Sequence, residues 1–454
     1  MRKLFGTDGI RAVAGESPLD PKTIYAIGLA LAHSLCKQTP APRVVLGMDT
    51  RESSEWIAAT LTQGLREGGA ETANAGVIPT PGIAFLTRAH GFAAGIVISA
   101  SHNPWQDNGI KMFGADGYKL ADAVELQMES EIFERLANVQ EPSQHAAALP
   151  AVNPSFRDDY IAFLLGNVPD LRLEGKILVL DCANGAASSI TPALFAALGT
   201  NAAGGKLVLT HSAPNGRNIN EHCGALHASV VAKEVVANHA EMGITFDGDA
   251  DRVLFADAQG NVVNGDAVLL IAARDLQSRG LLRSDLVVAT TMSNMGLEAA
   301  LSRSNIRMAR APVGDKYVLE EMQRSHAILG GEQSGHILFT DRSTTGDGLL
   351  TALLILEILQ RTQKSLAALK QDLKVFPQVI VNVRVREKKP LEAIPSVALT
   401  LREAEEELHG NGRIVVRYSG TEALARVMIE AESEEVMQRH ATRIAEAIRN
   451  EIGA

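Results

Sequence analysis

Hydrophobic and polar positions along the first third of the chain alternate between short apolar runs and longer amphipathic stretches. Apolar runs at 44–48, 72–77 and 96–98 predict buried strands. Helical spacing of the apolar residues at 20–35 and 53–66 predicts two helices in the same part of the chain. Strands separated by helices are typical of a layered α/β domain with a parallel or mixed sheet.

This rhythm restarts twice further along the chain. The second round contains three predicted strands and two predicted helices, at 176–180, 207–210, 244–246, 188–198 and 227–239. A third round begins after Asn264, with a predicted strand at 286–290 and predicted helices at 294–304 and 347–359. No exact internal repeat is visible, but the succession of similar units predicts three related α/β domains with mixed sheets.

The last part of the chain has a different pattern. It predicts three strands and two helices, at 379–386, 413–417, 425–430, 391–408 and 434–452. This grouping favours a smaller C-terminal α+β domain. Four domains also suit a chain of 454 residues, because single domains usually have ~100–200. The predicted boundaries are 1–150, 151–253, 254–368 and 369–454, with the Pro- and Ala-rich segment 141–154 as a linker.

Composition narrows the class of protein. Hydrophobic residues make up 46% and charged residues 21%, as in ordinary soluble globular proteins. Aromatic residues are only 4%, so the cores are expected to consist of Ala, Val, Ile and Leu. A formal net charge of -10 argues against nucleic acid or an anionic membrane as the main partner. An anionic substrate would then be attracted by local Arg, Lys, a metal ion or helix N-termini.

The cysteines and the apolar runs bear on cellular location. Cys36, Cys182 and Cys223 are odd in number and widely spaced, so they indicate neither a disulfide framework nor a zinc site. Residues 1–8 lack the apolar region of a signal peptide, and no run of ~18 apolar residues occurs. We expect a cytoplasmic protein without a membrane span, as a monomer or homodimer.

The first candidate for chemistry is the segment 95–104, in which a predicted strand ends in Ser101-His-Asn-Pro. Pro104 prevents a regular continuation and biases Asn103 toward an extended conformation. Ser101 is therefore expected on a fixed loop at a strand end, where ligands bind in open α/β sheets. A serine in that place is a candidate nucleophile or phosphoryl carrier. A polar turn without chemistry is the alternative.

Three carboxylates, those of Asp247, Asp249 and Asp251, follow another predicted strand. On an extended or looping backbone they can converge on one hard cation, and without a cation they would repel one another. The segment begins like an EF-hand, but its sixth and twelfth positions are Arg252 and Ala258 instead of Gly and Glu. Magnesium is therefore preferred to calcium, and a solvated acidic turn is the alternative.

The loop 330–336 precedes a predicted strand at 337–339 and is rich in glycine and polar side chains. Glu332, Ser334 and His336 are the right kinds of groups to hydrogen-bond several sugar hydroxyls or an amine. An ordinary Gly-rich hairpin turn is the alternative.

A guanidinium, two hydroxyls and glycine-exposed amides occur together near the C-terminus. Such a set matches a dianionic phosphate, which a guanidinium binds in bidentate fashion. A β-turn with a surface arginine is the alternative. The residues concerned are Arg417, Ser419, Gly420, Thr421 and Arg426.

Two further candidates are basic residues. Arg11 follows a Gly-flanked turn, and Lys111 lies on the strand after Ser101. Either could instead be a solvated surface charge.

Together these segments resemble the α-D-phosphohexomutase superfamily over essentially the whole chain and in the order that the family has. The shared motifs are Phe5-Gly-Thr-Asp-Gly-Ile-Arg11, Ser99-Ala-Ser-His-Asn-Pro104, Asp247-Gly-Asp-Ala-Asp-Arg252, Gly331-Glu-Gln-Ser-Gly-His336 and Arg417-Tyr-Ser-Gly-Thr-Glu422. Gln333 and the Gly6–Gly9 opening most resemble the branch that acts on glucosamine phosphates. The chain departs from the family at Ala423 and Ala425, where proline and a larger apolar residue are usual, and neither change removes a ligand.

The resemblance implies three related α/β domains and a C-terminal domain of another type around a central active-site cleft. It also implies a reaction in which phosphorylated Ser101 donates its phosphoryl group to glucosamine 6-phosphate. A 1,6-bisphosphate intermediate then turns over, and glucosamine 1-phosphate leaves for the synthesis of UDP-N-acetylglucosamine and cell-wall precursors. Mg²⁺ would be held by a phosphoserine oxygen and by Asp247, Asp249 and Asp251.

The resemblance implies roles for the remaining residues. Lys111 and Arg11 would handle protons and stabilise charge near Ser101, and His102 would orient the loop. His336 would act from the side of the sugar. Substrate would be bound by Arg252, Glu332, Ser334, His336, Arg417, Ser419, Gly420, Thr421 and Arg426.

Other functions fit part of the same pattern. A phosphomannomutase or phosphoglucomutase of the same superfamily would differ only in sugar preference. A haloacid-dehalogenase-like phosphohydrolase also uses Asp-x-Asp after a strand, but its usual Thr or Val is Asp251 here, and it leaves the Ser101 loop unexplained. A non-catalytic phosphosugar-binding protein is a further alternative, but the chain retains every expected ligand, which argues against it.

Overall fold

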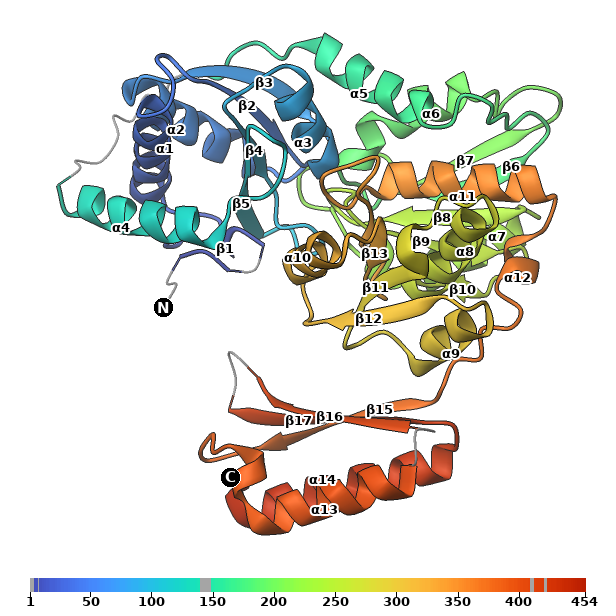
Figure 1. Cartoon of the computed structure of the whole chain (residues 1–454). Helices are drawn as coiled ribbons and strands as arrows, with labels where there is room; N and C mark the ends of the chain where they lie inside the picture. The colour runs from blue at the N-terminus through green and yellow to red at the C-terminus, as the bar shows by residue number, and fades with distance from the viewer. Residues whose placement is uncertain (1–3, 7, 139–147, 409–411, 420–422) are drawn as a thin grey trace. The chain divides into compact units, whose positions relative to one another are not determined.

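Three mixed sheets with their helices and one antiparallel sheet with helices make up the protein, which confirms the predicted fold class (Figure 1). The computed structural model describes residues 4–6, 8–138, 148–408, 412–419 and 423–454. By internal contacts the chain divides into two units, one of residues 1–292 with 306–370 and one of 293–305 with 371–454. The four domain boundaries drawn from the sequence stay a prediction. Among the described helices, none combines the length and apolar character needed to cross a membrane.

The first sheet has the strand order β1-β5-β4-β2-β3. Its strands are β1 (Ile10–Val13), β2 (Arg43–Met48), β3 (Glu71–Val77), β4 (Ala94–Ile98) and β5 (Asp107–Gly114). Its helices are α1 (Pro21–Cys36), α2 (Ser54–Glu67), α3 (Thr80–Ala89) and α4 (Asp122–Asn138). Asp20 caps α1 by accepting from Thr23 N at 3.0 Å, and the helix begins with proline. Ile27 of α1, Leu61 of α2 and Leu46 of β2 share one buried core.

The second sheet has the order β10-β9-β8-β6-β7 and the third the order β12-β11-β13-β14. The second is built from β6 (Ile177–Asp181), β7 (Lys206–Thr210), β8 (Met242–Phe246), β9 (Val253–Asp257) and β10 (Val262–Val263), with α5 (Pro154–Gly166), α6 (Thr191–Ala197) and α7 (Ser229–Ala237). The third is built from β11 (Leu286–Thr290), β12 (Arg307–Ala311), β13 (Leu329–Gly331) and β14 (Ile337–Phe339). Helices α8 (Gly265–Ser278), α10 (Asp315–Ser325), α11 (Gly348–Thr362) and α12 (Leu366–Leu369) complete the first unit.

The same strand pattern recurs in all three mixed sheets. In each, one strand pairs in parallel with two neighbours, and the second of these neighbours pairs with an antiparallel return strand. The parallel strand and its return strand are β4 and β5, β8 and β9, and β13 and β14. The Ser101 loop, the Asp247 loop and the Glu332 loop connect these three pairs. The three loops therefore occupy equivalent places, each at the carboxyl end of a parallel strand.

The second unit contains an antiparallel sheet of order β15-β17-β16. Its elements are α9 (Met295–Arg303), β15 (Gln378–Arg384), α13 (Pro395–Leu408), β16 (Gly412–Tyr418), β17 (Leu424–Ala431) and α14 (Glu434–Ile452). The predicted bounds of α14 are confirmed. The prediction of one helix over 391–408 is wrong, because Ile394, before Pro395, is extended and separates a short 3-10 turn from α13.

Asp347, which caps α11, allows a test of stability against pH. Its Oδ1 accepts from Leu350 N and its Oδ2 from the Tyr160 hydroxyl, both at 2.9 Å. Burial raises the pKa of Asp347 from 3.8 to about 6. Because the folded-state pKa is the higher one, the stabilising contribution is complete below the unfolded pKa and is lost as pH rises through the folded pKa.

We expect Asp347→Asn, which keeps a capping side chain, to remove this pH dependence. Between pH ~4 and pH ~8 the free energy of unfolding should move in favour of the variant, relative to the wild type, by about 2–3 kcal/mol, since one pKa unit is worth ~1.4 kcal/mol. Urea unfolding of both proteins at the two pH values measures the difference. A difference that does not change with pH would contradict the expectation.

Candidate active site

Ser101 lies just after β4 in a left-handed backbone conformation, with φ 53, and it is 1% exposed. Its backbone N donates to the Ser99 hydroxyl at 3.0 Å, and Ser99 Oγ donates to Asp49 Oδ2 at 2.6 Å. A non-glycine residue holds such a conformation only when its surroundings enforce it. The hydrogen bonds through Ser99 and Asp49 therefore hold the loop in one conformation.

The carbonyl oxygen of Ser101 is held from the side. It accepts from Arg51 Nη2 at 3.2 Å and from Asn220 Nδ2 at 2.9 Å. Gly248 passes so close that a Cβ there would lie 2.5 Å from the Ser101 oxygen. Sequence reasoning missed Asp49, Arg51 and Asn220. The position of Asp49 and Arg51 directly after β2, a strand parallel to β4, was a signal that could have found the first two.

The Ser101 side chain meets the Asp247 loop. Ser101 Oγ donates to Asp247 Oδ2 at 2.5 Å and lies 3.2 Å from His102 Nδ1. These serine and aspartate residues are 146 positions apart in the chain. The structure thus brings together the two sequence motifs that were predicted to act on one phosphoryl group.

Asp247, Asp249 and Asp251 are buried, and one oxygen from each lies within 4.8 Å of the others. Burial, and then the charges of Asp251 and Asp249, raise the pKa of Asp247 well above its usual value. Asp249 Oδ1 is buried and accepts no hydrogen bond from the described residues. Three oxygen ligands with an unused lone-pair site fit a hard cation such as Mg²⁺.

Lys111 on β5 is 1% exposed, so the alternative of a solvated surface charge is wrong for it. Its Nζ lies 2.8 Å from Asp249, 3.2 Å from Asp251 and 3.0 Å from Asp8. Burial alone would lower the pKa of Lys111, but these three carboxylates raise it well above its usual value. Lys111 is therefore an ammonium in this arrangement, paired with three carboxylates. Sequence reasoning also missed Asp8.

The two histidines of the site have opposite electrostatic surroundings. Burial, and then the cations Arg252 and Arg11, lower the pKa of His102 to about 4. Burial also acts to lower the pKa of His336, but its contacts with Asp251 and Asp315, both at 3.7 Å, raise it above the usual value. His102 is thus neutral near pH 7, and its Nδ1 faces Arg252 Nη1 at 3.1 Å.

The Glu332 loop between β13 and β14 presents two of its three predicted sugar ligands together. Glu332 is 8% exposed, and its Oε2 accepts from the exposed Ser334 hydroxyl at 3.4 Å. Its Oε1 accepts from Gly314 N at 3.0 Å. The Gln333 side chain instead donates to Asp266 of α8 at 3.1 Å. We therefore expect Glu332 and Ser334, and not Gln333, to contact a sugar directly.

The predicted phosphate ligands lie in the second unit. Arg417 on β16 and Arg426 on β17 are directly opposite in the sheet register. Like charges in such a pair repel each other, and a bound dianion would remove the repulsion. Lys388 Nζ donates to Ser419 O at 2.6 Å and adds a cation that the sequence reasoning did not include. Gly420 and Thr421 lie outside the described residues.

The two departures from the family pattern lie in β17 and directly before it. Ala425 is fully buried, and the carbonyl of Ala423 accepts from Val385 N at 2.9 Å. Ala425 is thus packed within regular strand pairing next to Arg426, and Ala423 lies just before β17.

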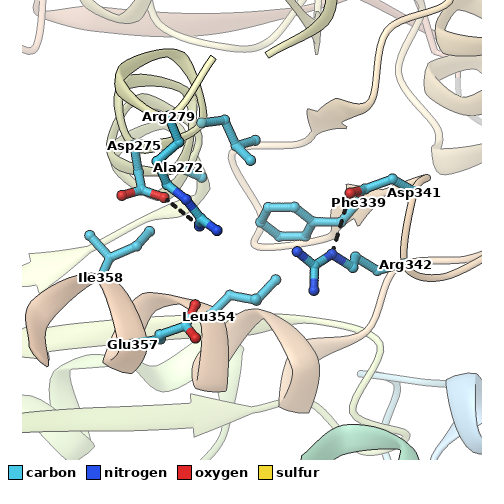
Figure 2. A pocket seen from close by; sticks show the side chains of 10 residues that line it. Ala272, Asp275, Arg279, Phe339, Asp341, Arg342, Leu354, Glu357 and Ile358 are labelled. Atoms are coloured by element: carbon cyan, nitrogen blue, oxygen red, sulfur yellow. Dashed lines mark hydrogen bonds and ion pairs between the residues drawn. The ribbon is translucent and has the colours of Figure 1, made fainter. Parts of the chain in front are cut away.

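A small pocket between α8 and α11 lies apart from these residues (Figure 2). Its charged side chains are paired, Arg279 with Asp275 at 3.4 Å and Arg342 with Asp341 at 3.3 Å. Its volume is about 20 Å³, which suffices for one water molecule and not for a sugar phosphate. We exclude it as a substrate site.

Family models for all four phosphoglucomutase/phosphomannomutase domains match the chain in order. The α/β/α domains I, II and III match residues 2–138, 158–260 and 264–376, and the C-terminal domain matches 380–447. The chain therefore belongs to the phosphoglucomutase/phosphomannomutase family of α-D-phosphohexomutases. Relatives along the whole length include the phosphoglucosamine mutases of Koribacter versatilis, 58% identical, and Solibacter usitatus, 50% identical. Both alignments cover 100% of this chain, with 98% and 99% of the respective relative.

Solved structures share the architecture. A phosphoglucomutase/phosphomannomutase family protein from Burkholderia thailandensis has a TM-score of 0.78 at 23% identity, over 98% of this chain and 97% of that one. The N-acetylphosphoglucosamine mutase of Aspergillus fumigatus, in complex with GlcNAc-6P and magnesium, has a TM-score of 0.67 at 18% identity, over 99% and 96%. At these identities the likeness shows the fold.

Proposed function

We propose that this chain interconverts glucosamine 6-phosphate and glucosamine 1-phosphate, the activity of a phosphoglucosamine mutase, with Ser101 as the phosphoryl carrier. The observation that supports this most is the bond of buried Ser101 Oγ to Asp247, within a set of three carboxylates. The full-length identity of 58% to a phosphoglucosamine mutase supports the choice of sugar. The enzyme is an isomerase, and we place it in the cytoplasm as a monomer or homodimer.

The reaction has two phosphoryl transfers. In the first, the bond between phosphorus and Ser101 Oγ breaks as a new bond forms to the sugar O1, whose proton leaves. In the second, the phosphoryl group on O6 passes to Ser101, O6 takes up a proton, and glucosamine 1-phosphate is released. Each transfer depends on positioning and on neutralising charge, because negative charge is spread over the oxygens of the phosphoryl group as it moves.

The residues near Ser101 divide this work. Asp247, Asp249 and Asp251 would hold Mg²⁺ together with a phosphoserine oxygen, and the ion would supply Lewis-acid neutralisation of phosphoryl charge. Lys111 and Arg11 would stabilise the remaining negative charge. His102 would orient the loop, and His336 would exchange a proton from the sugar side.

Both ends of a phosphosugar need a ligand, because the intermediate must react first at one end and then at the other. Glu332 and Ser334 would bind the sugar ring in either orientation. The phosphate that is not reacting would be bound by Arg417, Ser419, Gly420, Thr421 and Arg426. Arg252, which belongs to the first unit, is a further predicted substrate ligand. One phosphate site can then serve both orientations.

Sugar preference tests this proposal. The Glu332 carboxylate favours the charged amino group of glucosamine over a hydroxyl, because a charge-assisted hydrogen bond is about twice as strong as a neutral one. We expect kcat/KM for glucosamine 6-phosphate to exceed that for glucose and mannose 6-phosphates by at least ~10-fold, and Glu332→Gln to reduce this ratio by ~10-fold.

Comparing sugars within one enzyme preparation cancels any loss of folded protein. Equal kcat/KM values for the three sugars in the wild type would remove the glucosamine assignment and favour a broad phosphomannomutase or phosphoglucomutase of the same family. An unchanged ratio in Glu332→Gln would remove Glu332 from sugar selection.

A further inference from the structure

Six side chains, in which carboxylates alternate with basic groups, form a closed ring through the site. Each is near the next through a nitrogen–oxygen pair, and the order round the ring is Asp8, Lys111, Asp251, His336, Asp315 and Lys119. The most exposed of these side chains is that of Asp8, at 21%. Asp8, Lys119 and Asp315 have no role in the function proposed above.

Asp8 holds the cations beside Ser101. Its Oδ2 lies 3.0 Å from Lys111 Nζ and also bonds to Arg11. The turn that carries Asp8 is packed on β5, because a Cβ on Gly9, at φ +80, would lie 2.4 Å from Ile110 O. Asp8 therefore fixes the ammonium and the guanidinium relative to each other and to the strand.

Asp8 becomes more important for holding Lys111 when Asp247, Asp249 and Asp251 bind a cation. Of the three carboxylates around Lys111, those of Asp249 and Asp251 belong to the predicted metal ligands. A divalent cation there competes with the ammonium for them. Asp8 is outside that set and stays available to hold Lys111 in place.

Lys119 fixes Asp8 in turn. Its Nζ lies 2.5 Å from Asp8 Oδ1 and bonds to Asp315 Oδ2, although 196 positions separate Lys119 from Asp315. This pairing connects the turn at the N-terminus of the chain to the first residue of α10. A lysine bridging two carboxylates, with a side chain only 15% exposed, keeps a defined geometry more readily than a solvated pair.

The start of α10 also holds the Glu332 loop. Asp315 Oδ2 lies 3.7 Å from His336 Nε2, and the preceding residue, Gly314, donates its N–H to Glu332 at 3.0 Å. The Lys119–Asp315 pair thus joins the groups that would face the sugar to the cations that would face the phosphoryl group.

We propose that Lys119 and Asp315 are positioning residues of the mutase, which act through Asp8 and His336 to align the cations beside Ser101 with the sugar-binding loop. This inference rests on the proposed function. Neither residue needs to touch the substrate. Their loss displaces groups that do, and misplacement of about 1 Å can cost ~100-fold in rate.

Steady-state kinetics of Lys119→Met, Asp315→Asn and the double variant test the inference. We expect Lys119→Met to lower kcat by ~10–100-fold, with KM within ~3-fold of the wild type. The double variant should be no slower than the slower single variant, because both changes break one connection. Lys119→Arg, which retains the charge, should regain most of the loss.

Lys316→Met is the matched control. Lys316 follows Asp315 on α10 and is also well buried, but it pairs with Asp122 and Glu125 and is not part of the ring. Its kcat should stay within ~2-fold of the wild type.

Two readouts do not depend on activity. They are the Kd of glucosamine 6-phosphate for the metal-free protein, measured by calorimetry, and the thermal midpoint of unfolding. Both should stay near wild type in Lys119→Met, which a general loss of structure would not allow.

The outcomes separate the inference from the function on which it rests. An active wild type with unchanged kcat in Lys119→Met, or with losses that multiply in the double variant, would overturn the inference alone. If substrate affinity and the thermal midpoint of Lys119→Met fell along with kcat, the role of Lys119 would be structural, and positioning would be excluded. An inactive wild type would remove both proposals.

Discussion

Replacing Ser101 with alanine is expected to lower mutase turnover by at least ~10⁴-fold, since the variant has no oxygen to accept or return the phosphoryl group. Ser101 is buried, and its hydroxyl is bonded to Asp247 within the proposed metal site. Intact-protein mass should show a wild-type species ~80 Da heavier than the calculated chain, the mass of one phosphoryl group, which is missing from the variant.

Two other serines serve as controls for this experiment. Ser155→Ala removes an exposed hydroxyl at the start of α5 and should change neither turnover nor mass pattern. Ser99→Ala should keep the heavier species on Ser101 but lower turnover, because Ser99 Oγ connects the Ser101 backbone to Asp49. Near wild-type turnover in Ser101→Ala would exclude the phosphoserine mechanism, and a heavier species on Asp247 would favour a hydrolase.

Asp249→Asn should lower turnover by ~10³-fold and weaken Mg²⁺ binding by at least ~100-fold. Asp249 is fully buried, and its Oδ2 already accepts from Thr80 and Lys111, whereas its Oδ1 has no donor among the described residues. An amide would keep the shape of the side chain and remove the negative charge that a cation needs. Calorimetric titration with Mg²⁺ and the magnesium dependence of turnover after chelation measure the two effects.

A carboxylate outside the site controls for the loss of charge itself. Asp341→Asn changes an exposed aspartate that pairs with its neighbour Arg342, and it should bind Mg²⁺ as the wild type does. Full turnover of the wild type in excess chelator would contradict a metal requirement. Full Mg²⁺ affinity in Asp249→Asn would remove this residue from the ligand set.

Local patterns predicted β4 and β8, which lead into the Ser101 and Asp247 loops, because a short apolar run bounded by glycine and polar residues is a property of neighbouring positions. They missed β13, which leads into the Glu332 loop, and the prediction of a loop over 330–336 is wrong at Gly330 and Gly331, which belong to that strand. They did not predict α4 and α10, whose many charged residues weaken the apolar periodicity. The break before Pro395 was also missed, although the proline was visible. The helical spacing of apolar residues on both sides of Pro395 conceals the restriction that proline places on the backbone of Ile394.

The Ser101 motif, the aspartate triplet, the Glu332 loop and the family to which they point were determined by the sequence alone, since each is a set of residue types at short spacing. Only the tertiary structure decided that Lys111 is a buried ammonium, that the pKa of His102 is lowered whereas that of His336 is raised, and that Asp8, Lys119 and Asp315 complete a ring. Burial and pairing over more than 100 positions set these charge states, and no local pattern encodes them. The Ser101 hydroxyl lies beside Asp247 for the same reason: two equivalent loops, far apart in the chain, meet at the ends of their sheets.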